Sequence, residues 1–261
     1  MDYSAMKPKE VRSLIRAGEI TGPTAGMCSG YAQANLVILP KDLAYDFLLF
    51  TQRNPKSCPL LEVSDTGSRF LREIADGADI ARDIPRYRIY RKGVLDGEMT
   101  DISSLWQEDF VSFLIGCSFS FESALLESNV PVRHIEEGRN VPMYKTNIPC
   151  TPAGVFRGNM VVSMRPIPHE LVPRAVLITG EMPRVHGAPI HIGDPAAIGI
   201  SDLFHPDVGD MVTITDGEVP VFWPCGVSTQ NVVMESKPPL AITHAPGHML
   251  ISDIRNTELK Y

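Results

Sequence analysis

Two histidines and an aspartate lie on a loop that is too rich in proline and glycine to form a helix. The stretch RVHGAPIHIGDP, residues 184–195, carries His186, His191 and Asp194. Its prolines exclude a regular helix, so the side chains would be held on a stiff loop. Imidazoles titrate near neutral pH and an aspartate can orient one of them, as acid–base catalysis requires. The loop therefore predicts one wall of a small-molecule active site, although a single loop histidine is more often structural.

A second candidate is the stretch GCSFSFE, residues 116–122, which contains Cys117 and Glu122. We expect it to join two helices. The free N–H groups at the start of the second helix favour an anion and could lower the pKa of Cys117. The alternative is that Cys117 is a buried small hydrophobic residue and Glu122 an ordinary charge of a first helical turn.

Hydrogen-bond donors cluster in two neighbouring stretches, MYKTNIPC (143–150) and FRGNMVVSMRP (156–166). An arginine can bind a carboxylate through two parallel hydrogen bonds. As a group, one or two of these residues are expected to face a ligand, whereas each taken singly is better explained as surface charge. The candidates for substrate binding here are Lys145, Asn147, Arg157, Asn159 and Arg165.

Two further turns carry groups that bind metals or ligands. FWPCGVS (222–228) places Cys225 between a proline and a glycine, and THAPGHMLISD (243–253) holds His244 and His248. With the earlier histidines these side chains could bind a metal, but only if the fold happens to bring them together. We therefore assign them to substrate binding, expect no metal and no cofactor, and keep a metal-dependent enzyme as an alternative.

Several function classes are disfavoured by what the chain lacks. It has no phosphate-binding loop, no dinucleotide fingerprint and no HExxH zinc motif, and GCSFS lacks the final glycine of a nucleophile elbow. A net charge of −7 argues against nucleic acid and anionic membranes as partners. Five cysteines without CxxC spacing, and a start that lacks the pattern of a signal peptide, predict reduced thiols and a cytoplasmic location. The sequence leaves a homo-oligomer open.

The elements that would position these groups alternate along the chain. The stretch 67–75 reads equally as helix or loop, 95–98 reads as a turn, and short strands and turns dominate 184–250. The expected helices are 7–17, 40–55, 104–116, 120–129 with Ser120 (or, less well, Ser123) as its N-cap, and 168–183, and the expected strands are 35–40, 58–63, 86–93 and 159–166. This alternation predicts a sheet-based mixed α/β and α+β fold in one compact unit, 1–261.

Eight blocks of the sequence together resemble the D-glutamate cyclase family, whose short bacterial members are called hydro-lyases. The resemblance runs from about Met6 to Asp253, with Ser228 and Ser252 where threonine is expected. It implies an α/β part with a smaller α+β part, in two interleaved subdomains. The blocks are GYAQANLVILP, NPKSCPLLEV, FLIGCSFSFE, NVPMYKTNIPC, GNMVVSMRP, HGAPIHIGDP, VPVFWPCGVS and HAPGHMLISD.

The reaction that the resemblance implies is the conversion of D-glutamate to 5-oxo-D-proline and water. The reaction needs a general base that deprotonates the α-ammonium. It also needs hydrogen-bond donors and an acid that release water from the γ-carboxylate, and a cationic or N–H group that binds the α-carboxylate. Because the amine is tethered to its electrophile, we expect the backbone at Cys117 to form an anion hole rather than its thiol to form a thioester. The expected catalytic residues are His186, Glu122, Cys117, His191 and Asp194. A non-catalytic protein that binds a small carboxylate is the remaining alternative.

Overall fold

Strand β1 (Tyr31–Pro40) crosses the centre of the larger of two sheets in the computed structural model, which describes residues 2–260. Its side chains alternate between two apolar cores: Leu36 belongs to the core on one face and Val37 to the core on the other. Both faces of the sheet are thus covered, as the unbroken apolar run of this strand requires.

The larger sheet is antiparallel throughout, with strand order β2-β5-β1-β10-β3-β4, and β11 pairs with another part of β1. Besides β1 it contains β2 (Leu60–Val63), β3 (Tyr87–Arg91), β4 (Val94–Met99), β5 (Phe110–Gly116), β10 (Ala241–His244) and β11 (Leu250–Arg255).

The smaller sheet has the order β6-β7-β9-β8 and is also antiparallel. Trp223 on β9 joins the same apolar core as Leu36 of the larger sheet, whereas its neighbour Phe222 faces a separate small core. One core therefore passes between the two sheets. The strands are β6 (Met143–Pro149), β7 (Asn159–Pro168), β8 (His191–Ile192) and β9 (Glu218–Pro224).

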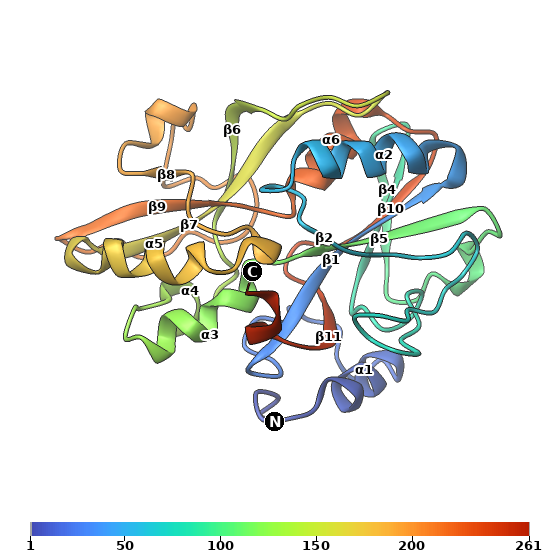
Figure 1. The fold of residues 1–261 in the computed structure, drawn as a ribbon, viewed down its shortest axis with the longest axis horizontal. Coiled ribbons are helices and arrows are strands. Elements are labelled where there is room, and N and C mark those ends of the chain that lie inside the picture. The colour runs from blue at the N-terminus through green and yellow to red at the C-terminus, as the bar shows by residue number, and fades with distance from the viewer. Residues whose placement is uncertain (1, 261) are drawn as a thin grey trace.

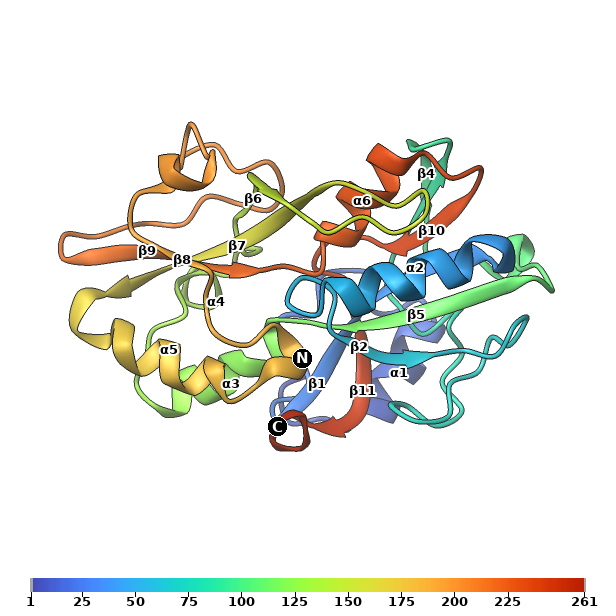
Figure 2. The same ribbon diagram turned by 45° about the horizontal axis from the view of Figure 1, so that its top comes forward.

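The helices cover the sheets in two groups (Figures 1 and 2). Helices α2 and α6 lie together above the larger sheet, and α3 and α5 pack against each other beside the smaller one. The α-helices are α1 (Pro8–Arg16), α2 (Lys41–Arg53), α3 (Phe119–Glu127), α4 (Arg133–Glu136), α5 (Val172–Gly180) and α6 (Ser228–Ser236). Short 3-10 turns occupy Ser103–Leu105, His169–Leu171, Pro183–Val185, Pro195–Ile198 and Asn256–Leu259.

The predicted mixed sheet-based fold is confirmed. Helices α1, α2, α3 and α5 occur where the sequence predicts them, as do strands β1, β2, β3 and β7, and the open stretch 67–75 forms no helix. The single unit spanning 1–261, with two interleaved subdomains, stays a prediction.

The helix predicted over 104–116 is wrong, because Phe110–Gly116 is strand β5. All seven residues of β5 are buried, since it lies between β2 and β1 and is covered on both faces. A continuous apolar run of this length fits a buried strand as well as a helix. Gly116, the last residue of the strand, must be a glycine for a steric reason: a Cβ there would lie 2.1 Å from the carbonyl oxygen of Arg184.

Three smaller expectations are also wrong. The turn predicted at 95–98 is part of strand β4, and the hairpin turns instead at Lys92 and Gly93, both with positive φ. Helix α3 begins after Ser118 rather than at Ser120 or Ser123. Helix α6 lies within a stretch for which strands and turns are predicted; its first six residues are buried, so it lacks an amphipathic pattern.

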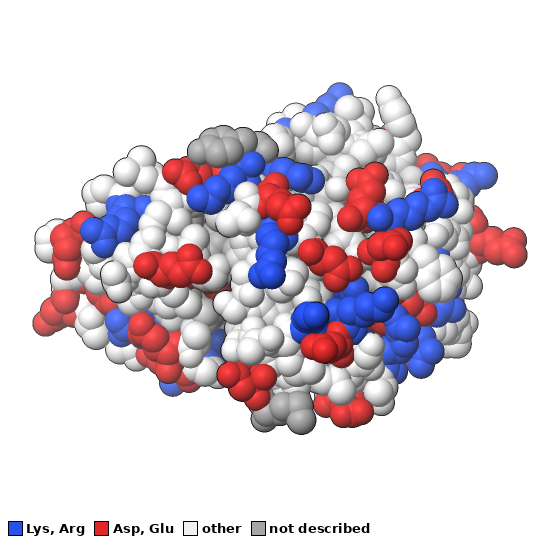
Figure 3. All heavy atoms as spheres, turned by 60° about the horizontal axis from the view of Figure 1, so that its bottom comes forward, with Lys and Arg blue, Asp and Glu red and all other residues white. Residues whose placement is uncertain are grey.

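Charged side chains of both signs are interspersed on the face of the molecule that carries α1 (Figure 3). Arg12 pairs with Asp253 at 2.9 Å and Arg16 with Asp83 at 2.6 Å, and both pairs fix α1 to the body of the protein. In the described part of the chain, no helix is both long enough and apolar enough to cross a membrane.

Candidate active site

Arg165 is a fully buried guanidinium on strand β7. It lies between two aromatic rings, 5.1 Å from the ring centre of Phe121 and 5.5 Å from that of Trp223. Its Nη1 donates to the hydroxyl of Ser163 and its Nη2 to that of Ser118, each at 3.1 Å. The strand, the start of α3 and strand β9 thus hold this cation in one fixed orientation.

Glu122, in the first turn of α3, is the counter-ion of Arg165. Its Oε1 accepts from Arg165 Nη2 at 2.5 Å and Nε at 3.2 Å, and lies 3.0 Å from Nε2 of His134. Burial works to raise the pKa of Glu122, but the charges and hydrogen bonds of His134 and Arg165 outweigh it and lower this pKa. The group is therefore a carboxylate near neutral pH, although it is buried.

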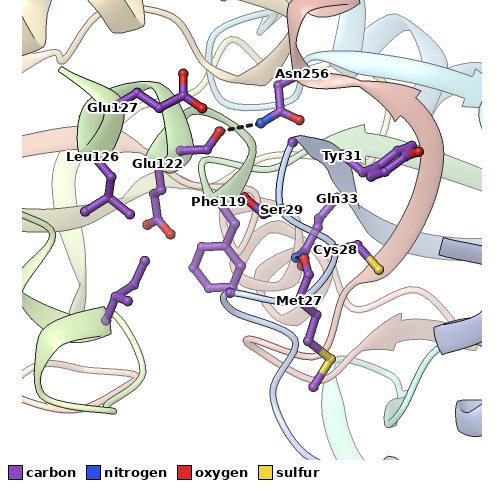
Figure 4. Close-up of a pocket in the computed structure, with 14 residues that line it drawn as sticks. Met27, Cys28, Ser29, Tyr31, Gln33, Phe119, Glu122, Leu126, Glu127 and Asn256 are labelled. Atoms are coloured by element: carbon purple, nitrogen blue, oxygen red, sulfur yellow. Dashed lines mark hydrogen bonds between the residues drawn. The ribbon is translucent and has the colours of Figure 1, made fainter. Parts of the chain in front are cut away.

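A pocket of about 160 Å³ opens beside Glu122 (Figure 4). One wall is the loop 26–31, and the facing wall is α3 with Phe119 and Glu122. Asn256 reaches in from the other side and donates to Ser123 at 2.7 Å. Within residues 2–260, all the contacts to the Glu122 carboxylate go to Oε1. Because Glu122 lines the pocket, Oε2 is the oxygen left to meet a ligand.

His134, on the short helix α4, links this pocket to a second cavity. Its ring is buried and stacks on Phe119 at 6.1 Å. On its other side it lines a cavity of about 360 Å³ that also includes Asn140 and Asp210. The pair Glu122–His134 therefore stands between two cavities, an arrangement suited to moving a proton.

Cys117 lies directly before α3, as predicted, but its thiol does not have the expected low pKa. Burial raises this pKa well above its usual value, and the backbone N–H of Phe119 offsets only part of the effect. Cys225 is buried too, and burial raises its pKa to about 11. Of the two possibilities for the Cys117 thiol, a lowered pKa does not occur, because desolvation outweighs the effect of the helix N-terminus, and the side chain is buried as the alternative has it.

The loop 184–195 divides into a buried and an exposed half. His186 is buried; its Nδ1 lies 2.8 Å from the carbonyl oxygen of Lys56, and burial lowers its pKa to about 4. His191 is partly exposed, and its Nε2 lies 2.6 Å from the backbone oxygen of Asp194. The Asp194 carboxylate caps the following turn through the N–H of Ala196. It therefore does not orient His191, and neither histidine lines the Glu122 pocket.

Several predicted binding residues lie away from this pocket. Arg157 is exposed near Ser236, and Asn159 donates to the backbone of Thr146. Burial lowers the pKa of His244 to about 4, and its Nδ1 contacts the backbone of Leu36. All eight predicted binding residues lie outside the pocket lining: Lys145, Asn147, Arg157, Asn159, Arg165, Cys225, His244 and His248. In the described chain, no three His, Cys, Asp or Glu side chains converge as metal ligands would.

The sequence analysis missed His134 and the loop 26–31. His134 follows no motif, because its partner Glu122 is brought to it only by the packing of α3 against α4 and β7. The loop carries a signal that could have been used: Gly26 and Gly30 are four residues apart, and both have positive φ. Such spacing is typical of a tight loop that approaches a ligand closely.

Comparison with known proteins agrees with the resemblance read from the sequence. The profile of the D-glutamate cyclase family matches residues 111–253, which include Glu122, His134 and Arg165. The chain belongs to this family. A relative from Clostridium beijerinckii named "Putative hydro-lyase" is 69% identical over the full length of both chains. Relatives from Thermoanaerobacter sp. and Bacillus subtilis, also named hydro-lyases, are 62% and 63% identical, covering 99% and 97% of this chain and 98% and 99% of their own.

One solved structure of another kind has a distant likeness. It is a nitrogen repressor-like protein from Methanococcus jannaschii, with 9% identity and a TM-score of 0.39, covering 94% of this chain and 97% of its own. This likeness carries no argument about the site, whose residues are identified by the geometry described above.

Proposed function

We propose that the protein is a lyase that removes water from a small amino dicarboxylate at the Glu122 pocket, converting D-glutamate to 5-oxo-D-proline. The observation that supports this most is the carboxylate of Glu122. One of its oxygens is held by Arg165 and His134, and the other is left for a ligand in a cavity of about 160 Å³. Family membership supports the reaction class.

The reaction moves two protons within one substrate. A bond forms between the amine nitrogen and the γ-carbon, and a C–O bond of the γ-carboxylate breaks. The nitrogen loses two protons overall, and both leave on the departing oxygen as water. The protein therefore needs a group that takes a proton from nitrogen and a group that gives one to oxygen.

Glu122 and His134 are suited to this transfer. In the proposal, Oε2 of Glu122 binds the substrate ammonium and accepts its two protons one after the other. His134, 3.0 Å from Oε1, shares each proton while Glu122 holds it, and Glu122 passes each one to the departing oxygen, which leaves as water. Arg165 holds the carboxylate still and stays protonated throughout. Fixed geometry of this kind removes the cost of orienting the catalytic group during the reaction.

The carboxylates of the substrate need donors at the other side of the pocket. Arg255 is the candidate for this role, because it lies against two residues of the pocket lining, Tyr31 and Gly30. Its guanidinium lies 4.0 Å from the ring centre of Tyr31. Its Nη1 would lie 3.4 Å from a Cβ added to Gly30. The anion-hole role of the backbone at Cys117 stays a separate proposal, because at the start of α3 the N–H groups of Ser120 and Phe121 already donate to the carbonyl oxygens of Cys117 and Ser118. Catalytic roles for His186, His191 and Asp194 stay proposals, and none of the three lines this pocket.

The substrate screen that tests the proposal uses D-glutamate, L-glutamate and other small dicarboxylates, with mass spectrometry following the loss of one water. We expect loss of water from D-glutamate. Leu126→Trp should block it, because Leu126 lines the pocket and is 43% exposed on α3. Leu177→Trp is the matched control, since Leu177 is 71% exposed on α5 outside the pocket. Ligand-induced stabilisation without any turnover would instead favour a binding protein and contradict the proposal.

A further inference from the structure

We propose a second ligand site, for a small carboxylate with an apolar chain, in a cavity where helix α6 lies between the two sheets. The cavity holds about 110 Å³. Its apolar walls include Val161 of β7, Val227 just before α6, and Met234 on α6. Its lining shares no residue with that of the Glu122 pocket.

The charge at this cavity favours an anion. Lys145, on β6, lines it with an exposed ammonium that forms no ion pair or hydrogen bond with any residue from 2 to 260. The other two charged groups are already engaged. Arg88 donates to Glu98 at 2.8 Å, and Asp207 accepts from the backbone N–H of Lys145 at 2.8 Å. Of the two cationic side chains in the lining, Lys145 is thus the one without an ion pair among the described residues, and it is available to an anionic ligand.

The floor of the cavity adds a buried donor. The hydroxyl of Tyr90, a residue only 2% exposed, reaches Oε1 of Gln230 at 3.5 Å, at the outer limit of a hydrogen bond. Gln230 is held in place by the bond from its Nε2 to the carbonyl oxygen of His244 at 2.9 Å. A ligand carboxylate could take the Tyr90 hydroxyl as a shorter and stronger donor.

The two cavities border the same apolar cluster. Val161 and Val227 of the second cavity pack in one cluster with Cys225, and Phe119 of the Glu122 pocket packs against it. A ligand between α6 and β6 would therefore contact side chains that support a wall of the Glu122 pocket. This placement suits an effector rather than a substrate.

Titration of the whole protein with butyrate, followed by ligand-observed NMR, tests the site, with butylamine as a probe of the same size and opposite charge. Butyrate is expected to bind at about millimolar Kd, as small fragments do. Lys145→Met should weaken binding about fivefold, and Leu95→Trp, at the exposed mouth of the cavity, should abolish it. The matched controls Lys9→Met on α1 and Val94→Trp on β4 lie outside the lining and should bind as the parent does.

Other results would overturn the proposal. These are absence of butyrate binding to the parent protein, butylamine binding at least as tight as butyrate, or parent-like binding by both Lys145→Met and Leu95→Trp. Loss of butyrate binding in Glu122→Gln but not in Lys145→Met would place the ligand in the first pocket and also overturn it. Because binding rather than turnover is measured, the test is independent of the proposed reaction.

Discussion

At the scale of single residues, the site depends on how two buried side chains, Arg165 and His134, share one oxygen of Glu122. Arg165 and His134 both meet Oε1 of Glu122, and no side chain of the described residues meets Oε2. Removing one partner from such a group leaves an uncompensated buried charge, which is far more costly than the pair is stabilising. The cluster is therefore a structural requirement as well as a candidate for catalysis.

Arg165→Met should lower the free energy of unfolding by about 3–5 kcal/mol, because it leaves the buried Glu122 carboxylate with His134 as its remaining partner. Arg165→Lys keeps the charge but loses the fork that joins Glu122, Ser118 and Ser163, and should also destabilise. Urea unfolding measures both changes. Arg157→Lys, an exposed control, should stay within about 0.5 kcal/mol of the parent. Parent-like stability of Arg165→Met would show that the guanidinium is not buried as described.

His134→Gln should reduce kcat by roughly 10²-fold while leaving KM nearly unchanged, because the proposed role of His134 is proton transfer rather than substrate binding. Steady-state kinetics on the substrate found in the screen measures this. His169→Gln is the control, since His169 is exposed on a turn far from the pocket lining. A raised KM with parent-like kcat would instead make His134 a binding residue.

Cys117→Ser should keep most of the activity, because burial holds this thiol protonated and the cyclisation needs no covalent intermediate. Iodoacetamide should correspondingly label Cys117 slowly in the native protein at neutral pH. A folded Cys117→Ser variant that binds substrate but shows no turnover would point to a thioester and contradict the anion-hole role.

At the scale of elements, local pattern predicted most helices and strands but not which residues meet. Helix α3 and strand β7 were both expected, and each carried a candidate, Glu122 and Arg165. Their contact depends on the packing of α3 against β7 and β9, which no local pattern encodes. Strand β5 was mistaken for a helix because a strand buried on both faces has no alternation.

The same physical limit explains why the predicted binding residues do not converge on the Glu122 pocket. Lys145 and Arg157 are candidates because they carry donors near expected strand ends; in the structure Lys145 lies within β6 and Arg157 just before β7, and neither lines the Glu122 pocket. His134 lies on a helix of four residues, too short to show any periodicity. Residue type alone thus identified the two central charged residues, Glu122 and Arg165, and only the fold could identify their partner His134.

At the scale of the whole molecule, stability should depend on pH through two buried histidines. Burial lowers the pKa of both His186 and His244 to about 4. The unfolded chain, with an ordinary histidine pKa near 6.5, binds more protons than the folded chain between about pH 6.5 and 4. Stability is therefore fully present above about pH 6.5 and is lost as the pH falls through this window.

Urea unfolding at pH 7.5 and pH 5 should show a loss of about 2 kcal/mol for each of these histidines at the lower pH. His186→Asn removes one of them and should have a correspondingly weaker dependence on pH. His169→Asn, at an exposed position, should keep the dependence of the parent. A parent-like dependence in His186→Asn would contradict the neutral, buried state of His186.

The central claim is that the free oxygen of Glu122 carries out the chemistry of the pocket. Its most direct test is the rate at which D-glutamate is converted to 5-oxo-D-proline by the parent protein and by Glu122→Gln, with circular dichroism showing that the variant is folded. The account predicts product formation by the parent and a loss of at least about 10²-fold in the variant. A folded Glu122→Gln protein that turns over D-glutamate at the parent rate would contradict it, as would a parent protein that releases no water from D-glutamate.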